Sequence, residues 1–379
     1  MSSAVLDRTA ALAAIVDDVI APAAADTDRT GAYPRAALDA LGAAGFLGLF
    51  SSPDVGGGGG SLADVAGVVE EIAAACGSTA MVVLMHYAAV SVIEAHGPVE
   101  VREAIARGEH VSSLALSEAG SRSHFWTPLG TATTDGDAVR LDAAKSWITS
   151  AGQADSYVWS SRPLAADGPM TLWLVPADAA GLSVAAPFDG LGLRGNSSNP
   201  VRAEGVPVAA TAGLGDDGAG LDIALGVVLP TFLVGNAAFS VGLMEALVGS
   251  AAAHLTSSRL EHLDQTLAQQ PIPRVEFARL RTRADEARAF LADTLTALAE
   301  GRPDATLRVL QVMAVAAEAS SEVADGVLRL CGGAAFRKEV GVERRFRDSL
   351  AARVMAPTTD ALRDFVGRAT LGLPLLGDA

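Results

Sequence analysis

The sequence predicts an α+β fold in three parts: a helical domain over residues 1–110, a middle β domain over 111–215 and a helical bundle over 216–379. Three observations predict this fold. Apolar residues recur at helical spacing throughout the first part. β-branched residues, alternation and turn signals dominate the second, and helical periodicity returns in the third. A chain of 379 residues is also too long for one simple core, so several packed domains are expected.

The first part is predicted to be helical with one break. An apolar stripe runs from Leu6 to Ile20 at helical spacing. Five glycines at 56–60 cannot remain helical and mark a loop. Strongly apolar helices are predicted over 62–76 and 79–97, and Ser61 is a suitable N-cap for the first of them.

The second part is organised around residues 112–150. Residues 113–118 form a short apolar strand that ends in a hydroxyl and a carboxylate, and Asp135-Gly136-Asp137 is a hairpin turn signal. The return strand ends with Trp147 and Thr149. Because residues i and i+2 of a strand point to the same side, both can address one planar ring system. Further strands are expected at 155–160, 170–175 and 201–206.

The segment after the first of these strands is small and rich in hydroxyl groups. Gly120 and Ser121 break the strand, and Ser123 offers a hydroxyl and a backbone N–H in a turn. Such a loop can bring N–H groups close to a phosphate. The β domain therefore has a surface suited to a flat ligand that carries phosphate, unless Trp147 is simply a core residue of a plain β domain.

The third part is predicted to contain four helices. They are expected over 222–260, with Pro230 near a bend or start, and over 275–300, 305–332 and 359–369.

Composition excludes several classes of partner. The net charge of −16 and the pI near 4.7 disfavour nucleic acid, which requires clustered Lys and Arg. No continuous apolar run of membrane-spanning length stands out, so no membrane partner is expected.

Asp17 and Asp18 interrupt the N-terminal apolar stretch, which argues against a signal peptide. Cys76 and Cys331 are expected to be buried structural thiols, no metal site is expected, and the cytoplasm is the expected location.

Two segments of the middle part carry a family resemblance. Residues 117–124, Ser-Glu-Ala-Gly-Ser-Arg-Ser-His, resemble the Thr-Glu-Pro-Gly-x-Gly-Ser-Asp loop of the acyl-CoA dehydrogenase superfamily. Residues 143–150, Ala-Ala-Lys-Ser-Trp-Ile-Thr-Ser, resemble the Gly-Ser-Lys-x-Trp-Ile-Thr-Asn strand of that family. The two matches come in the family's order and at its spacing. The resemblance implies an N-terminal helical domain, a middle β-barrel or sheet domain and a C-terminal four-helix bundle.

The resemblance also implies FAD as cofactor. It implies that Ser117 faces the flavin pyrimidine, Ser123 the pyrophosphate, and Trp147 and Thr149 the isoalloxazine. The full set of implied cofactor residues is Leu116, Ser117, Ser123, Trp147, Ile148, Thr149, Arg259, Arg329, Gly332, Gly333, Thr358 and Asp360.

The C-terminal members of this set match the family less closely. Arg329 replaces the Gln of a Gln-x-x-Gly-Gly motif, although as a cation it suits a phosphate. Arg259 lies one residue from the family's Arg and lacks the Phe-Gly that follows it there. Because family members take adenylate-binding groups from a neighbouring subunit, the resemblance implies a homodimer or homotetramer.

The family's usual catalytic base is missing. Ala356 occupies the position of the family's Glu, and the alternative placement, Val227 to Val234, contains neither Glu nor Arg. Alanine cannot accept a proton, and losing a positioned base costs roughly two to four powers of ten in rate. His86 and His124 are the candidate replacements, since histidine titrates near neutral pH. The alternatives are a core histidine for His86 and a loop or surface residue for His124.

The resemblance leaves three functional hypotheses. The first is an FAD-dependent oxidoreductase of the acyl-CoA dehydrogenase type that acts on an acyl-CoA or related acyl thioester. The second is a flavin-dependent monooxygenase on the same fold, which uses reduced flavin and O2 and needs no base for an α-proton. The third is a non-catalytic flavin-binding paralogue.

Overall fold

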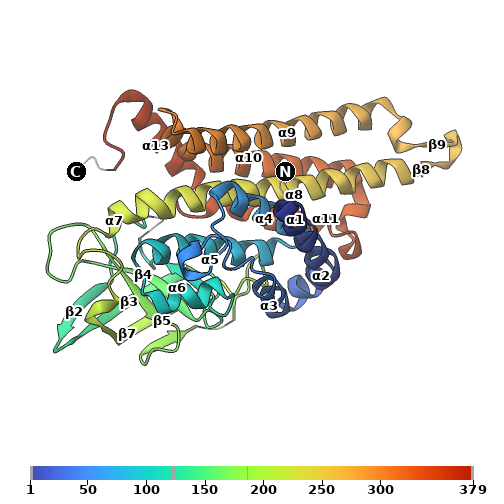
Figure 1. The fold of residues 1–379 in the computed structure, drawn as a ribbon. Coiled ribbons are helices and arrows are strands. Elements are labelled where there is room, and N and C mark those ends of the chain that lie inside the picture. The colour runs from blue at the N-terminus through green and yellow to red at the C-terminus, as the bar shows by residue number, and fades with distance from the viewer. Residues whose placement is uncertain (1–2, 122–123, 186, 377–379) are drawn as a thin grey trace. The chain divides into compact units, whose positions relative to one another are not determined.

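The computed structural model describes residues 3–121, 124–185 and 187–376 (Figure 1). The chain forms two compact units. The first comprises Met1–Val68, Ser78–Gly190 and Arg194–Phe232. The second comprises Val69–Gly77, Leu191–Leu193 and Leu233–Ala379. The predicted α+β architecture, with helices before and after a β region, is confirmed.

Helices precede the sheets along the chain. They are α1 (Ser3–Ile15), a π-helical turn (Val16–Ile20), α2 (Ala21–Thr30), α3 (Arg35–Ala43), α4 (Leu62–Ala75), α5 (Gly77–His96) and α6 (Val99–Ala106). The predicted N-cap of α4 is confirmed. The Ser61 N–H donates to Asp64 Oδ2 at 2.7 Å, and the Asp64 N–H donates to Ser61 Oγ at 3.3 Å, so the two residues cap the helix start reciprocally.

The five-glycine segment is a packed loop rather than a helix, as predicted. The N–H groups of Gly57 and Gly58 donate to the carbonyls of Ser52 and Gly48, both at 2.9 Å. A Cβ at Gly57 would lie 2.3 Å from the Ser51 carbonyl oxygen, closer than any real contact. Glycine is therefore required here for close backbone approach.

Two sheets form the β region of the first unit. A three-stranded sheet has the order β1 (Ser112–Ala115), β4 (Ser156–Ser161), β5 (Thr171–Pro176). A four-stranded antiparallel sheet has the order β2 (Thr131–Asp135), β3 (Ala138–Ile148), β7 (Asn199–Ala209), β6 (Leu182–Val184). The predicted hairpin is confirmed, because β2 and β3 are joined by a tight turn in which Gly136 has a φ of 60°.

The inner faces of the two sheets share one hydrophobic core. Trp159 and Val175 come from the three-stranded sheet, and Leu141, Val201 and Val206 from the four-stranded sheet. Alternate residues of β3 and β7 point inward and are buried, which is the pattern of sheets packed face to face. The sheets therefore present a stable frame whose loops and strand ends are available for ligands.

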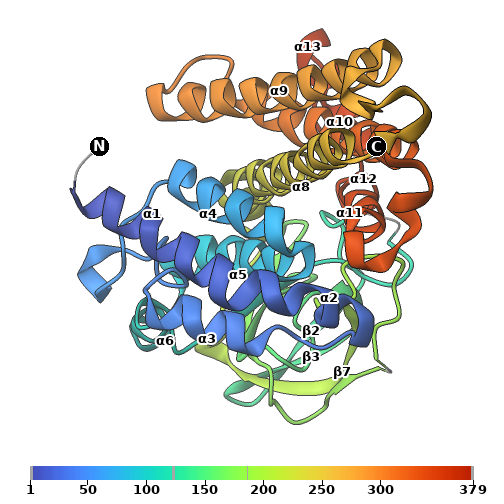
Figure 2. The ribbon, with the colours of Figure 1, turned by 90° about the vertical axis from the view of Figure 1, so that its right-hand side faces the viewer.

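Four long helices form the bundle of the second unit: α8 (Leu229–Ser257), of which residues 233–257 belong to this unit, α9 (Pro271–Glu300), α10 (Ala305–Cys331) and α13 (Thr359–Leu371). Figures 1 and 2 both show α8, α9 and α10 running side by side. Ion pairs join neighbours along their surfaces, at 2.9 Å between Arg281 and Glu245 and at 3.0 Å between Arg283 and Glu322. The predicted helices of this region are confirmed.

The predicted helix over 222–260 has an irregular start. It begins with α7 (Gly220–Ile223) and a π-helical turn (Ala224–Val228), and Pro230 is the second residue of α8. Proline lacks the N–H that would donate to the carbonyl four residues earlier. The Thr231 hydroxyl donates to the Val227 carbonyl at 2.9 Å, which satisfies one backbone acceptor in this distorted turn.

Three smaller helical or hairpin elements of the C-terminal region were not predicted: α11 (Val342–Ser349), α12 (Ala351–Val354) and the hairpin of β8 (Arg259–Leu260) with β9 (Gln265–Thr266). Cys76 and Cys331 are both buried, as expected, and neither forms a disulfide.

Two helical stretches are long and apolar enough to cross a membrane by length and composition alone, Gly77–His96 and Gly220–Ser257. The sequence expectation had not singled them out. Their most apolar windows are 78% and 72% buried within the structure, as core helices of a folded domain are.

Candidate functional site

Trp147 is presented to solvent by an irregularity at the end of β3. The register between β3 and β7 shifts between Lys145 and Ile148, which marks a β-bulge, and Trp147 has a φ of 59°. The Trp147 side chain is 70% exposed, whereas Ile148 and Thr149 are 1% and 4% exposed. This exposure excludes the alternative in which Trp147 is a core residue.

The bulge contradicts the prediction that Trp147 and Thr149 point to the same side of the strand. Regular alternation puts residues i and i+2 on one side of a strand, but a left-handed residue interrupts the pleat. The indole instead meets the ring of Phe188 edge-on, with centroids 6.4 Å apart and an interplanar angle of 85°. Phe188 therefore contacts the indole of Trp147 but leaves most of it exposed.

The two segments that carry the family resemblance lie next to each other. The Ser146 N–H donates to the Ser117 carbonyl at 3.0 Å, and the Ala119 N–H donates to the Ala144 carbonyl at 2.9 Å. Residues 117–119 thus run antiparallel to residues 144–146. This pairing brings half-buried Ser117 close in space to the strand that carries Trp147.

The remaining cofactor residues predicted in the first unit differ in exposure. Leu116 is buried, and its carbonyl accepts a long hydrogen bond from the Ser160 hydroxyl at 3.5 Å. Ile148 is part of the core between the sheets. Ser123 lies outside the described residues.

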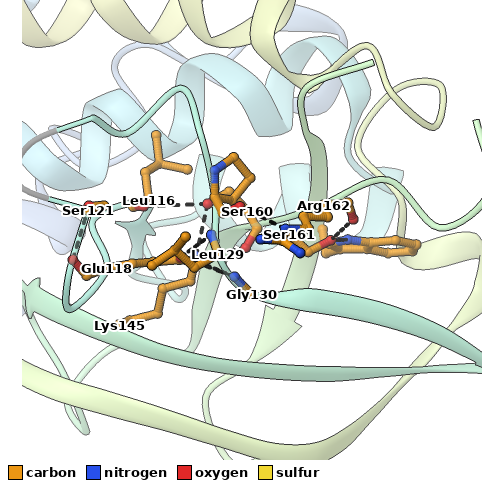
Figure 3. A network of polar contacts seen from close by, with 11 residues as sticks. Leu116, Glu118, Ser121, Leu129, Gly130, Lys145, Ser160, Ser161 and Arg162 are labelled. Atoms are coloured by element: carbon orange, nitrogen blue, oxygen red, sulfur yellow. Dashed lines mark hydrogen bonds and ion pairs between the residues drawn. The ribbon is translucent and has the colours of Figure 1, made fainter. Parts of the chain in front are cut away.

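A buried ion pair links the same two segments, and sequence reasoning missed it. Lys145 Nζ donates to Glu118 Oε1 at 2.7 Å, and Figure 3 shows the two side chains meeting beside Ser160. Burial lowers the pKa of Lys145 to about 8, while the Glu118 charge opposes that shift, so the ammonium form prevails at neutral pH. The signal that could have found the pair is the pairing of the two segments, which sets Glu118 opposite Lys145.

The structure places His86 in the core of the first unit. Its Nε2 lies 3.0 Å from the Leu47 carbonyl, and its Nδ1 accepts the Ser112 N–H at 3.2 Å. Burial lowers the pKa of His86 to about 4, so the ring is neutral at pH 7. With no exposed surface and both nitrogens engaged by backbone, His86 has the geometry of a structural histidine rather than of a proton donor to a substrate.

His124 has the opposite setting. It is exposed, its Nδ1 lies 2.9 Å from the Ser121 carbonyl, and its ring packs edge-on against Trp126 with centroids 4.9 Å apart. His124 is therefore the better of the two candidates for acid–base work.

The other predicted cofactor residues belong to the second unit. Arg329 is exposed on α10, with its Nε 3.2 Å from Asp325, and Arg259 pairs with Asp264 across the β8–β9 hairpin. Gly332 ends α10 with a φ of 55°, and a Cβ added at Gly332 or Gly333 would meet nothing within 4 Å. The backbone at these two glycines is thus open to close approach.

The segment after α12 contains the position of the missing base. Ala356 is half-buried and contributes only a methyl group. Thr358 caps α13, because its hydroxyl accepts the Ala361 N–H at 3.3 Å, and exposed Asp360 forms a 3.5 Å ion pair with Arg363. Over residues 3–121, 124–185 and 187–376, no group of three or more His, Cys, Asp or Glu side chains is placed to hold a metal ion.

Comparison with known proteins gives matches along nearly the whole chain. Three family models match in order: the acyl-CoA dehydrogenase N-terminal domain at residues 8–108, the middle domain at 113–206 and the C-terminal domain at 218–371. A probable acyl-CoA dehydrogenase of Bacillus subtilis is 27% identical over 363 residues, covering 93% of this chain and 94% of that protein.

Two further matches extend the comparison. The mitochondrial isobutyryl-CoA dehydrogenase of Dictyostelium discoideum is 26% identical over 353 residues, covering 92% of this chain and 84% of that protein. The solved structure of butyryl-CoA dehydrogenase from Megasphaera elsdenii superposes with a TM-score of 0.91 at 21% identity, covering 98% of this chain and 99% of the other. At this identity the structural match establishes the fold.

Proposed function

Because the chain belongs to the acyl-CoA dehydrogenase family, whose enzymes are FAD-dependent oxidoreductases, we propose that it binds FAD and oxidises an acyl-CoA or a related acyl thioester. The observation that carries the proposal is the match of all three family domains, in order, between residues 8 and 371. The names of relatives favour short or branched acyl groups, since they include isobutyryl-CoA and short-chain-specific dehydrogenases.

The described residues fit a flavin dinucleotide in chemical character. Trp147 offers an uncovered aromatic face, and Ser117 a hydroxyl on the neighbouring segment. Gly332 and Gly333 leave space that any side chain would fill, and Arg329 is a cation suited to phosphate. Bound FAD would supply the two-electron acceptor of the reaction.

The protein's own contribution is binding, orientation and proton transfer. Removing the α-proton of a thioester needs a base, and the methyl group of Ala356 cannot serve. His124 is the proposed substitute, because it is an exposed histidine in the loop that begins beside Ser117. Leu116, Thr149 and Ser123 complete the proposed flavin-facing set of the β domain, and Arg259, Thr358 and Asp360 the proposed set of the helical bundle.

A second candidate is a flavin-dependent monooxygenase on the same fold, and Ala356 is the observation that favours it. A reaction of reduced flavin with O2 requires a proton donor and exclusion of water but no base for an α-proton. His124 would then act as the donor. A non-catalytic flavin-binding paralogue is the third candidate. The exposed Trp147 beside Ser117 favours a ligand site, which all three candidate functions require.

We further propose a homodimer or homotetramer in the cytoplasm. Large apolar side chains are exposed on the second unit, among them Ile272, Val275 and Phe336. Exposed apolar side chains of this size favour an interface between copies of the chain. Cys76 and Cys331 form no disulfide, which fits a reducing compartment.

The test is a turnover assay of the purified holoenzyme with a panel of acyl-CoA thioesters and an artificial electron acceptor. Acceptor reduction that depends on an acyl-CoA would support the dehydrogenase. Oxygen uptake that requires external reduction of the flavin and yields an oxygenated product rather than hydrogen peroxide, with no acyl-CoA-dependent acceptor reduction, would replace it with the monooxygenase. Bound flavin that is inert in both assays would favour the non-catalytic paralogue.

A further inference from the structure

The ion pair between Glu118 and Lys145 is fully enclosed. The Glu118 side chain is 2% exposed and that of Lys145 is 0% exposed. Removing two charges from water costs several kcal/mol per ion, and a well-packed apolar pair of similar volume is often at least as stable. The stability of the folded state alone therefore does not explain why these two buried positions carry charged side chains.

Every polar side-chain atom of the pair has a hydrogen-bond partner. Lys145 Nζ uses its three protons on Glu118 Oε1 at 2.7 Å, the Ser160 carbonyl at 2.7 Å and Ser160 Oγ at 2.9 Å. The ammonium also lies 5.0 Å from the centre of the Trp159 ring. Such a network is directional as well as strong, because each bond fixes an angle and a distance.

The carboxylate of Glu118 closes a loop. It accepts the N–H groups of Leu129 and Gly130, the latter at 3.1 Å from Oε2, so one side chain joins both ends of the segment 119–128. Figure 3 shows this clasp, with the backbone of Leu129 and Gly130 turned toward the carboxylate. A Cβ at Gly130 would lie 3.0 Å from Glu118 Oε1 and 2.7 Å from the Ala143 Cβ, so glycine permits the approach.

The pair adjoins the proposed flavin-facing residues without being among them. Glu118 directly follows Ser117, and Lys145 lies two residues before Trp147, inside the interval where the strand register shifts. The loop that Glu118 closes carries His124. One buried contact thus ties together the segment of Ser117, the loop of His124 and the bulge of Trp147.

We propose that the Glu118–Lys145 pair is a positioning device that builds the flavin-facing surface before the cofactor binds. Its bonds hold Ser117, the base of loop 119–128 and the Trp147 bulge in one arrangement, so that FAD meets a preformed face. Neither residue touches the cofactor or transfers a proton. The inference rests on the proposed binding of FAD.

The test compares three variants of the full chain, Glu118→Gln, Lys145→Met and the double substitution, with Glu204→Gln as the matched control. Glu204 is an exposed carboxylate on β7 of the same β region. Each protein is stripped of flavin and titrated with FAD. The dissociation constant, the visible circular dichroism of the bound flavin and the melting temperature of the apoprotein are measured.

We expect each single substitution to weaken FAD binding at least tenfold and to lower the melting temperature, since each leaves one buried charge alone. The double substitution is decisive, because it removes both charges. We expect its melting temperature to return toward that of the parent, while FAD binding remains at least fivefold weaker and the circular dichroism stays altered. The control should bind FAD within twofold of the parent.

Two results would overturn the inference. If the double variant binds FAD as tightly as the parent, with the same circular dichroism, the pair contributes only to stability. If Glu118→Gln binds FAD within twofold of the parent, the carboxylate does not position the site. A parent protein that takes up no FAD would overturn the proposed function as well, and this result is distinct because it appears before any substitution is made.

Discussion

At the scale of single residues, the indole of Trp147 has an unusual environment. A large aromatic side chain gains about 1.5–3 kcal/mol when it is fully buried, and Trp147 forgoes most of that gain at 70% exposure. A left-handed backbone adds a cost of about 1–3 kcal/mol at a residue with a large side chain. Strained and exposed aromatic residues of this kind are typical of ligand surfaces rather than of structural positions.

Replacing Trp147 separates these roles. We expect Trp147→Ala to raise the dissociation constant of FAD about two- to tenfold, because an aromatic contact contributes about 0.5–1.5 kcal/mol beyond its buried area. Trp147→Phe, which keeps a smaller aromatic face, should lie between the parent and the alanine variant. Flavin fluorescence titration of the apoprotein measures both. Unchanged affinity in Trp147→Ala would remove this residue from the site.

Ala356 offers a gain-of-function test. If the site accepts an acyl-CoA, Ala356→Glu should accelerate flavin reduction by up to about 10²–10⁴-fold, because it places a carboxylate at the position of the family's usual base. Ala356→Gln is the matched control, since it adds the same bulk without a base. Stopped-flow absorbance with a short-chain acyl-CoA follows the rate. Equal rates in the two variants would show that a carboxylate at position 356 does not reach the reacting carbon.

Histidines illustrate what sequence reasoning could decide at this scale. The sequence allows His86 to be either an acid–base group or a core residue, because both roles fit a His in an apolar helix. Its partners, the Leu47 carbonyl and the Ser112 N–H, are 39 and 26 residues away. Contacts over such separations follow only from the packed fold.

At the scale of elements, Asp217 fastens a loop of the β region. Its carboxylate accepts the N–H groups of Leu164, Ala165 and Ala166 at 2.8–2.9 Å, and the Thr171 hydroxyl. Burial favours the neutral acid, but these hydrogen bonds outweigh it and lower the pKa of Asp217 to about 2 from 3.8. The ionised carboxylate therefore stabilises the folded state.

The sign of the pH dependence follows from that lowered pKa. The contribution of Asp217 is fully present above pH 3.8 and is lost as the pH falls from 3.8 toward 2, because the folded state must then take up a proton it binds weakly. Asp217→Asn should lower the free energy of unfolding at pH 7 by about 1–2 kcal/mol. This loss corresponds to a melting temperature lower by a few degrees. The difference from the parent should shrink at pH 3. Asp216→Asn, at an exposed neighbouring carboxylate, should show no such trend, and a constant difference for Asp217→Asn would contradict the assignment.

The end of α10 allows a test of backbone conformation alone. Gly332 has a φ of 55° and a ψ of −137°, which L-residues rarely adopt, whereas a Cβ there would contact nothing. Gly332→Ala should therefore destabilise the protein by about 1–3 kcal/mol through strain. Gly333→Ala, with equally free space and no positive φ, should have little effect on thermal melting. Similar melting temperatures for the two variants would contradict this conformation.

The sequence predicts turns and helix caps well, because residues close together in the chain determine them. The turn at Asp135-Gly136-Asp137 and the cap at Ser61 are set by residues within a few positions of each other. The bulge at Trp147 was missed, because it depends on the register of β3 against β7, whose residues are more than 50 positions away. The pairing of Glu118 with Lys145 was missed for the same reason.

At the scale of the whole molecule, the order of helices, strands and helices followed from changes of periodicity along the chain. The family resemblance rested on short motifs, and matches to all three family domains confirm it. Composition and motifs could not supply the substrate, because the motifs concern the cofactor, and neither Ala356 nor Val227 to Val234 carries the family's base.

The central claim is that this chain holds FAD and passes electrons to it from an acyl thioester. The most direct measurement is an anaerobic titration of the flavin-containing protein with short-chain and branched acyl-CoA thioesters, followed in the visible spectrum. Our account predicts that at least one of them bleaches the oxidised flavin without any other reductant. A flavin spectrum that stays unchanged across the panel, in a protein whose flavin is reduced by dithionite, would contradict the dehydrogenase.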